Sequence, residues 1–304
     1  MMNKLSICQE QRERVLPVLS ICIGQVIWGF SYLFTRIAQR WASPDVVLSM
    51  RFLAATLIMT ALILCGKGSF SLKGKNFRVL LGLALLEPPY YFFESYGVYY
   101  SNATFAGTVM AFAPVVGIAA AVVFLGERPS RRQKIFCLLP TAGVIIMTAV
   151  GSSMGIIKPL GVVFLFASQI VAAAMKLFNK KSSEEFSAFE RTYAIMISNA
   201  IIFTTKSMID LRGNIHAYVE PLKNTEYVFA LIMLCVFCGI VANLLVNYAC
   251  GMMSVTKIST FSTIATICSA FGGVLLLHEP ITWMTFLGSA LIIVGIWQVT
   301  RNAT

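Results

Sequence analysis

Two segments of similar sequence, FLGERPSRRQ at residues 124–133 and LLHEPITWMT at residues 276–285, lie half a chain apart. Each follows a long apolar stretch, and aligning Glu127 with Glu279 gives an offset of 152 in a chain of 304 residues. This offset also pairs Thr104 with Thr256, Ala113 with Ala265, Val122 with Val274, Leu125 with Leu277, Leu139 with Leu291 and Gly143 with Gly295. The pattern predicts two sequence repeats, residues 1–151 and residues 152–304.

The composition is that of an integral membrane protein. Apolar residues make up 58% of the chain and charged residues 12%, whereas a soluble domain has about 25% charged residues. A membrane-spanning helix needs about 20 apolar residues. Ten segments qualify: 15–35, 45–65, 79–99, 104–125, 134–150, 159–179, 189–207, 227–250, 254–277 and 282–300. We therefore expect an all-α membrane protein, with a short surface helix in the connection at 207–226.

Five spans per repeat is an odd number, so the second repeat must enter the membrane upside down. With the N-terminus inside, fourteen Lys and Arg residues fall in inside segments and six in outside loops. Positive residues collect on the cytoplasmic side, which predicts a multi-pass protein of the cell (plasma) membrane with both termini cytoplasmic. Inverted repeats are typical of secondary transporters, which bind substrate near the midplane between the two halves.

The start of the chain, the cysteines and the net charge indicate no signal peptide, redox site or nucleic-acid partner. The first apolar segment has about twenty residues, longer than the roughly 7–15 of a signal peptide, and no A-x-A site follows it, so a retained helix is expected. The eight cysteines fall mostly in apolar runs, and we interpret CVFC at 235–238 as packing rather than a redox motif. The net charge of +11 reflects cytoplasmic loops and predicts no nucleic-acid partner.

The chain resembles the drug/metabolite transporter superfamily, in particular its EamA-type ten-helix members. The segments that carry the resemblance are WGFSYLFTR (28–36), SPDVVLSMRF (43–52), YYSNATFAGTVMAFAPVVGIAAAVVFLGERPS (99–130) and LLLHEP (275–280). The resemblance covers essentially the whole chain, more loosely in the sixth to eighth helices. It implies a carrier with a central cavity, lined mainly by the third, fourth, eighth and ninth helices, that exports amino acids or other small metabolites.

The stretch LLEPPYYFFE, residues 85–94, places two acidic residues inside the third span. Seven residues separate Glu87 from Glu94, which puts them on one face of a regular helix, about 10 Å apart along its axis. Pro88 and Pro89 each remove a backbone donor, so we expect a broken helix near the midplane. Such charged side chains are costly in a membrane and should face the protein interior with a partner.

Arg51 is expected to lie at the same depth as Glu94, and we predict that the two residues pair. Glu87 is then left without a cationic partner. Three interpretations of Glu87 remain open: it carries a proton, because burial favours the neutral carboxyl group; it stays neutral and bonds a neighbouring helix; or it contacts substrate.

Further polar and aromatic side chains are candidates for the cavity wall. They are Trp28, Tyr32, Tyr90, Tyr91, Asn243 and Thr263. The hydroxyl and amide groups among them could equally serve helix packing. Lys176 and Lys257 lie near the cytoplasmic ends of their helices, and we expect both to extend to the lipid headgroups. Glu127 and Glu279 are expected to cap helices.

The sequence lacks the motifs of the competing classes of protein. H-E-x-x-H fails because residue 282 is Thr, the chain has two histidines, and neither a G-x-S-x-G elbow nor a P-loop is present. We therefore expect no enzyme, cofactor or metal site. The expected function is secondary active transport of small polar metabolites by alternating access, with protons as a candidate coupling ion and membrane lipids as surroundings. The alternatives are a uniporter or exchanger of another metabolite or drug, and a membrane scaffold; monomer and homodimer both remain open.

Overall fold

The computed structural model describes residues 2–110, 157–253 and 283–301, the first thirteen of these by their backbone alone. Isolated positions are described between these ranges: 112, 116, 139, 142–143, 145–146, 258, 261, 264–266, 268–269, 272–273 and 275–276. Most of the predicted fourth, fifth and ninth spans therefore lies outside the described residues. The same holds for Thr263, Lys257, Glu127 and Glu279.

Every regular element in the described ranges is a helix. In chain order these are α1 (Met2–Ala38), α2 (Pro44–Leu64), α3 (Phe77–Tyr99), α4 (Ala103–Met110), α7 (Pro159–Ser182), α8 (Ala188–Asp210), α9 (Ile215–Val219), a 3₁₀ turn (Glu220–Lys223), α10 (Thr225–Ile232), a π-helical segment (Met233–Val241), α11 (Ala242–Met252) and α13 (Trp283–Arg301). The all-α prediction is thus confirmed for this part of the chain, and α9 is the short helix expected between residues 207 and 226.

Helices long and apolar enough to cross a membrane occur where the sequence predicts them. Four meet both criteria: Val15–Ala38, Pro44–Leu64, Pro159–Ser182 and Thr225–Met252. The predicted spans at 79–99, 189–207 and 282–300 coincide with α3, α8 and α13. The chain is therefore a membrane protein, while the count of ten spans stays a prediction.

The predicted break at Pro88 and Pro89 is wrong, because α3 is one continuous helix through both prolines. Two missing backbone donors are a local loss that the surrounding packing offsets. A Cβ atom at Gly82 or Gly97 would lie 2.4 or 2.6 Å from side chains of α7, so α7 approaches α3 closely near both of its ends.

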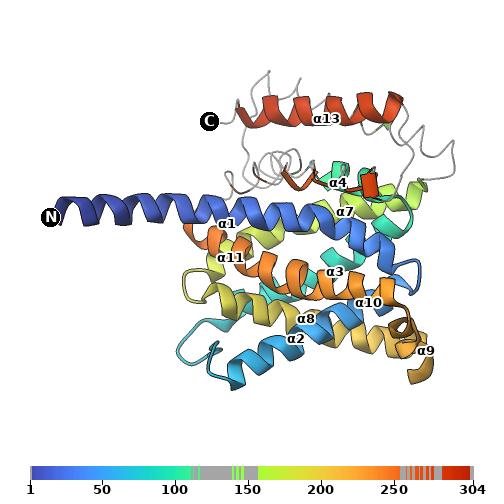
Figure 1. Ribbon diagram of the computed structural model, residues 1–304, viewed down its shortest axis with the longest axis horizontal. Helices are drawn as coiled ribbons and strands as arrows, with labels where there is room; N and C mark the ends of the chain where they lie inside the picture. Colours follow the sequence, from blue (N-terminus) through green and yellow to red (C-terminus); the bar gives the residue numbers. More distant parts are fainter. Residues whose placement is uncertain are drawn as a thin grey trace.

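Three antiparallel helix pairs dominate the packing: α3 with α7, α2 with α8, and α1 with α11. Direction follows from the contacts, since the side chains of Ser49 and Thr204 bond at 2.9 Å near the start of α2 and the end of α8. Thr60 and Tyr193 bond at 2.9 Å near the opposite ends. Figure 1 shows these helices side by side along the long axis of the molecule.

α1 and α3 run in the same direction and end together. Near these ends Gln39 donates to the backbone oxygen of Ser95 at 2.9 Å, and Arg36 donates to the backbone oxygen of Tyr99 at 3.1 Å. Because α7 is antiparallel to α3, α7 also runs opposite to α1.

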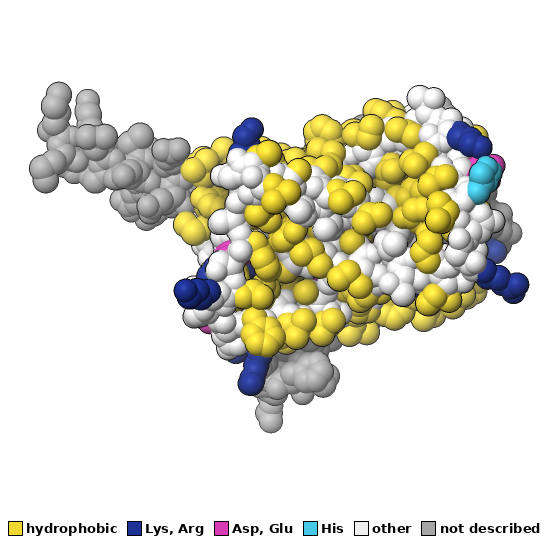
Figure 2. All heavy atoms as spheres, turned by 90° about the horizontal axis from the view of Figure 1, so that it is seen from below, with side chains coloured by type: hydrophobic (Ala, Val, Ile, Leu, Met, Phe, Trp, Pro, Cys, Tyr) yellow, Lys and Arg dark blue, Asp and Glu magenta, His cyan; other side chains and the backbone are white. Residues whose placement is uncertain are grey.

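The outer surface carries the apolar side chains expected of a membrane protein. Leu57, Ile170 and Ile201 are each more than half exposed. Figure 2 shows one face with apolar side chains across its middle and Lys and Arg side chains at its two ends. This distribution suits a surface that faces lipid between two polar boundaries.

Candidate functional site

A cavity with several polar and charged side chains in its wall lies between the helices, and its volume is about 130 Å³, measured as the space open to the centres of water molecules. One enclosed water needs about 10–15 Å³ of such volume, so the cavity has room for several waters or a small organic solute. Eight of the nine predicted site residues line it: Trp28, Tyr32, Arg51, Glu87, Tyr90, Tyr91, Glu94 and Asn243. The ninth, Thr263, lies outside the described residues.

Helical spacing explains why each helix presents several residues to this one space. α1 contributes Gln25, Trp28, Ser31 and Tyr32; α7 contributes Gln169, Ala172, Met175, Lys176 and Asn179; and α11 contributes Asn243, Val246, Asn247 and Cys250. Residues three, four and seven apart share one face of a helix. The unbroken α3 likewise brings Glu87 and Glu94 to the same cavity.

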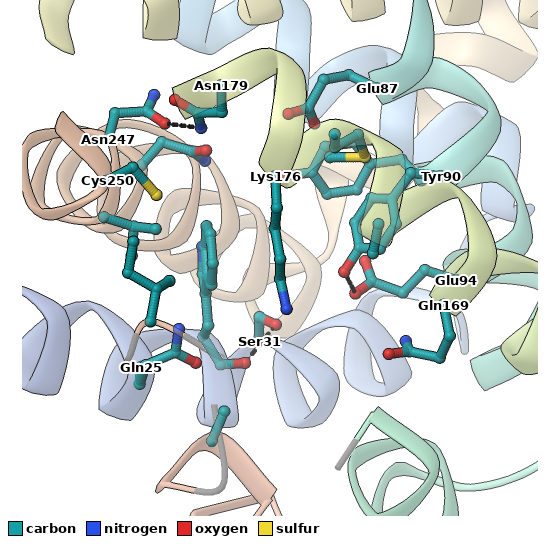
Figure 3. Close-up of a pocket in the computed structure, with 18 of the residues that line it drawn as sticks. Gln25, Ser31, Glu87, Tyr90, Glu94, Gln169, Lys176, Asn179, Asn247 and Cys250 are labelled. Atoms are coloured by element: carbon teal, nitrogen blue, oxygen red, sulfur yellow. Dashed lines mark hydrogen bonds between the residues drawn. The ribbon is translucent and has the colours of Figure 1, made fainter. Parts of the chain in front are cut away.

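Glu94 is held by two tyrosines rather than by an arginine. Its Oε1 accepts hydrogen bonds from the Tyr90 hydroxyl at 2.7 Å and from the Tyr32 hydroxyl at 3.2 Å. The pair with Tyr90 is drawn in Figure 3. The predicted pairing of Arg51 with Glu94 is wrong for this structure, since the ion pairs among the described residues do not include it. Tyr90, one turn away on α3, and Tyr32, on α1, both reach Glu94, whereas the Arg51 guanidinium packs against the rings of Phe52 and Tyr91.

Arg51 is held against aromatic rings. Its guanidinium carbon lies 5.0 Å from the ring centroid of Phe52 and 5.0 Å from that of Tyr91, and the residue is 3% exposed. These distances are within the range of cation–π attraction. Nε is enclosed and has no hydrogen-bond partner among the described residues.

Glu87 is 4% exposed and borders the same cavity. Within the described ranges, no hydrogen bond or ion pair reaches its carboxyl group. The interpretation of Glu87 as a neutral group bonded to a neighbouring helix therefore finds no support, and the proton-carrying and substrate-contacting interpretations remain.

Lys176 departs from its prediction. It was expected to extend to the lipid headgroups, but it lines the cavity, and Figure 3 shows its side chain crossing the open space toward Ser31 of α1. The face of α7 explains the difference, because Lys176 shares it with Gln169 and Ala172, which border the cavity too.

A hydrogen-bonded cluster ties three helices at one end of the cavity. Arg191 of α8 donates from Nη2 to the backbone oxygen of Asn247 at 2.6 Å and from Nη1 to both oxygens of Asn179. Asn179 donates to the Asn247 side chain at 2.6 Å, and Asn247 donates to the Thr192 hydroxyl at 2.8 Å. We call these four residues the Arg191 clamp. It joins α7, α8 and α11.

The opposite end of the bundle has its own polar ties. Asp45, at the start of α2, accepts from Lys206 of α8 at 2.8 Å and from the Tyr96 hydroxyl of α3. Lys206 also donates to Asp210 at 2.7 Å. Asp45 is buried, so this ionic contact is more than a solvated surface pair.

The π-helical segment ahead of α11 supplies backbone oxygens to side chains. The Cys238 oxygen accepts from the Trp28 indole at 3.2 Å and from the Asn243 amide at 3.2 Å, and the Gly239 oxygen accepts from Asn243 at 2.9 Å. π-Helical turns are rare and often occur at functional sites. This one fixes two cavity residues, Trp28 and Asn243.

The helices that line the cavity differ from those that the family resemblance implies. α3 and α11 contribute as expected, and Ile258 and Ala265 represent the ninth span. α4, expected to contribute, adds no lining residue in its described part, whereas α1 and α7 contribute many. Sequence reasoning missed Gln25, Gln169 and Asn179, although polar residues at spacings of three and seven mark one face of an apolar helix.

The described cysteines are free, with Cys235, Cys238 and Cys250 buried. The described residues also contain no group of three or more His, Cys, Asp or Glu side chains that could hold a metal ion.

Comparison with known families gives a match to the model of the EamA-like transporter family over residues 15–149 and again over residues 159–301. The chain belongs to the EamA-like transporter family. The two matched ranges together span most of the chain, which is consistent with a protein built from two copies of one unit.

Individual relatives agree with this assignment. A Bacillus subtilis (strain 168) protein named "Uncharacterized transporter YcxC" is 29% identical over 276 residues, covering 89% of this chain and 88% of the relative. An Archaeoglobus fulgidus protein named "Uncharacterized transporter" is 23% identical over 286 residues, covering 93% and 98%. A solved crystal structure with 16% identity matches with a TM-score of 0.64 over 94% of this chain and 97% of that one. At that identity the likeness concerns the fold alone.

The EamA assignment and the apolar helices make the chain a membrane transporter, and its family is one of transporters rather than enzymes. A transporter of this family handles small-molecule substrates in the membrane.

Proposed function

We propose that this EamA-family protein is a secondary active transporter that moves small polar metabolites by alternating access, with amino acids or related metabolites as its exported substrates. One observation carries the proposal: a cavity with room for a small solute, and with acidic and basic side chains in its wall, lies between helices of the two repeats. Polar side chains inside a membrane protein are costly, and they typically mark a substrate or ion pathway.

Helix directions support the inverted architecture. In two five-helix repeats, α1, α2 and α3 are the first, second and third spans of the chain, and α7, α8 and the segment α10–α11 are the sixth, seventh and eighth. Each counterpart pair runs antiparallel: α1 with α7, α2 with α8, and α3 with α11. The contact of α3 with α7 is also the counterpart of the contact of α11 with α1.

Alternating access requires two gates, and the Arg191 clamp and the contacts of Asp45 are the candidates. We infer a chain in the plasma membrane with both termini inside the cell, and the positive-residue count supports this orientation. The Arg191 clamp is then the cytoplasmic gate and the Asp45 contacts are the outer gate. Opening one set of contacts while the other stays closed would expose the cavity to one side at a time.

Glu87 is our candidate for proton coupling. It faces the cavity without a partner among the described residues, and a carboxyl group that alternates between the two sides can bind a proton on one side and release it on the other. Glu94 is less suited to this role, since two tyrosine hydroxyls already bind its carboxylate.

The experiment is counterflow in proteoliposomes. Purified full-length protein is first screened against metabolites by thermal shift, because a ligand that binds the native state raises stability by mass action. Solutes that stabilise the protein are then tested for exchange of labelled for unlabelled molecules. Saturable exchange supports a carrier; a scaffold would give the flux of protein-free liposomes for every solute. Accumulation driven by a proton gradient separates an active transporter from a uniporter.

A further inference from the structure

Arg51 is a buried cation whose N–H groups bond to no residue that the structure describes. Its guanidinium carries five N–H donors, yet no hydrogen bond or ion pair from it to any described residue is present, and the residue is 3% exposed. A buried charged group without hydrogen bonds is costly. Some other oxygen must therefore satisfy these donors, and in this cavity that means water or a solute.

Two aromatic rings hold the guanidinium beside the cavity. Phe52 and Tyr91 each lie 5.0 Å from its carbon and hold its position. Of its three nitrogens Nε alone is fully enclosed, so the two terminal nitrogens border the open space that Arg51 lines. An arginine held by aromatic rings keeps its N–H edge free, and that fork matches the two oxygens of a carboxylate.

The charges of the cavity are balanced. Arg51 and Lys176 are its basic residues, and Glu87 and Glu94 its acidic residues, in the part of the wall that the structure describes. Neither glutamate lies within ion-pair distance of Arg51, so the opposite charges stay apart in the same space. A solute with one negative and one positive group complements this arrangement better than a net anion or a net cation.

We propose that Arg51 is the carboxylate-binding residue of the substrate site and that the substrate is a small zwitterion whose cationic group faces Glu87. This inference rests on the proposed transport function and assigns the residues that bind the two charged groups of its substrate. Tyr90 and Tyr32 keep Glu94 occupied, which leaves Glu87 as the acidic group available to an ammonium.

Binding to the purified full-length protein tests the proposal without requiring transport. The probes are the twenty standard L-amino acids and, for each one that raises Tm, its carboxamide and methyl ester, which keep the ammonium and lose the carboxylate. The expected result is that at least one amino acid binds and that its amide and ester bind about ten- to a hundredfold more weakly, the range of one charged hydrogen bond. If no amino acid binds, or if the uncharged derivatives bind as tightly, the proposal is overturned.

Variants locate the carboxylate site. Arg51→Gln should weaken binding of the amino acid at least tenfold and leave the weak binding of its amide unchanged, while Arg51→Lys should retain part of the affinity. The matched control is Arg40→Gln, which removes an arginine from an exposed ion pair with Glu226. Equal loss of acid and amide binding in Arg51→Gln would mean a packing role for Arg51 and overturn the assignment. If that variant does not fold, the comparison of amino acid with amide on the wild-type protein still tests whether binding depends on the carboxylate, and Arg51→Lys tests the residue.

The inference and the transport function can fail separately. Saturable counterflow of sugars or polyamines, with no binding of amino acids, would confirm a carrier and contradict a zwitterionic substrate. Carboxylate-dependent binding at Arg51 without any flux would support the binding site and contradict the transport function.

Discussion

Glu87 and Glu94 stand two helical turns apart on α3 and border one cavity, but their surroundings differ. Glu94 accepts hydrogen bonds from Tyr32 and Tyr90, whereas Glu87 has no bond to the described part of the protein. A satisfied carboxylate contributes to stability, and an unsatisfied one facing a cavity is available to protons or solutes. We therefore expect the two glutamates to respond differently to substitution.

Tyr90→Phe should destabilise the protein. The substitution removes the shorter of the two hydrogen bonds to Glu94, and a buried polar group that loses its partner costs about 1–3 kcal/mol. We expect a lower Tm for the purified protein in detergent. Tyr248→Phe is the matched control, since Tyr248 is 38% exposed and its hydroxyl group has no partner among the described residues. Equal Tm changes in the two variants would contradict the role of Tyr90.

Glu87→Gln should separate coupling from translocation. The amide keeps the size of the side chain but cannot take up and release a proton, so accumulation driven by a proton gradient should fall to the uncoupled level. Counterflow should persist at saturating substrate, with a higher half-saturating concentration because the substrate's ammonium group loses its carboxylate partner. Glu226→Gln, an exposed change outside the cavity, should leave both activities intact. Gradient-driven accumulation that survives in Glu87→Gln would remove this residue from the coupling mechanism.

For individual residues, the sequence predicted which side chains line the cavity better than it predicted their hydrogen-bond and ion-pair partners. Charged residues inside apolar spans are expensive, so their burial around one shared cavity follows from energetics. The partner of Glu94 does not follow in the same way, because two tyrosines and an arginine all lie within reach and small shifts between helices decide among them. Lys176 shows the same limit: its distance from the helix end suited a headgroup contact, but the helix face directs it into the cavity.

Among the elements, the span from Thr225 to Met252 combines α10, the π-helical segment and α11. Its amphipathic pattern gives no sign of the π turn, since apolar residues suit either geometry. The continuity of α3 through Pro88 and Pro89 is a second case in which local rules fail. Proline lowers the stability of a helix, but the close packing with α7 outweighs that loss.

The Arg191 clamp gives a prediction about helix separation. Arg191 is 2% exposed and joins α8 to α7 and α11, so Arg191→Gln should loosen that end of the cavity. Cys250, buried on α11 and lining the cavity, should then react about tenfold faster with a maleimide, in a background without other cysteines.

The control for the clamp is Arg212→Gln, in an exposed turn outside the bundle. An unchanged reaction rate of Cys250 in Arg191→Gln would show that the clamp does not close this end of the cavity.

For the whole molecule, the repeat of 152 residues and the odd number of spans predicted an inverted pair of bundles. The antiparallel counterpart helices support that prediction, and the family match covers both halves. Substrate identity could not be predicted, because it depends on where a few polar groups stand relative to one another. The sequence gives their positions along the chain but not the distances between helices.

Orientation in the membrane can be measured at Cys65, an exposed cysteine at the end of α2. The positive-residue rule places it inside the cell. In a variant with no other cysteine, a membrane-impermeant maleimide should label Cys65 after cells are permeabilised and not before. Ser43→Cys, exposed at the start of α2, should be labelled in intact cells. The opposite labelling pattern would show that the chain has the inverse orientation, with the Arg191 clamp at the outer end and the Asp45 contacts at the cytoplasmic end.

The central claim is that water and solute reach the interior of the helical bundle through this cavity, and charged-reagent labelling tests it most directly. Ala172 lines the cavity, and Ile170, two residues earlier on α7, is 66% exposed on the outer surface. In a cysteine-free background reconstituted in lipid, a charged methanethiosulfonate should modify Ala172→Cys and leave Ile170→Cys unmodified. Modification of Ile170→Cys with Ala172→Cys protected would contradict the account, because lipid-facing thiols would then be wet and the cavity dry.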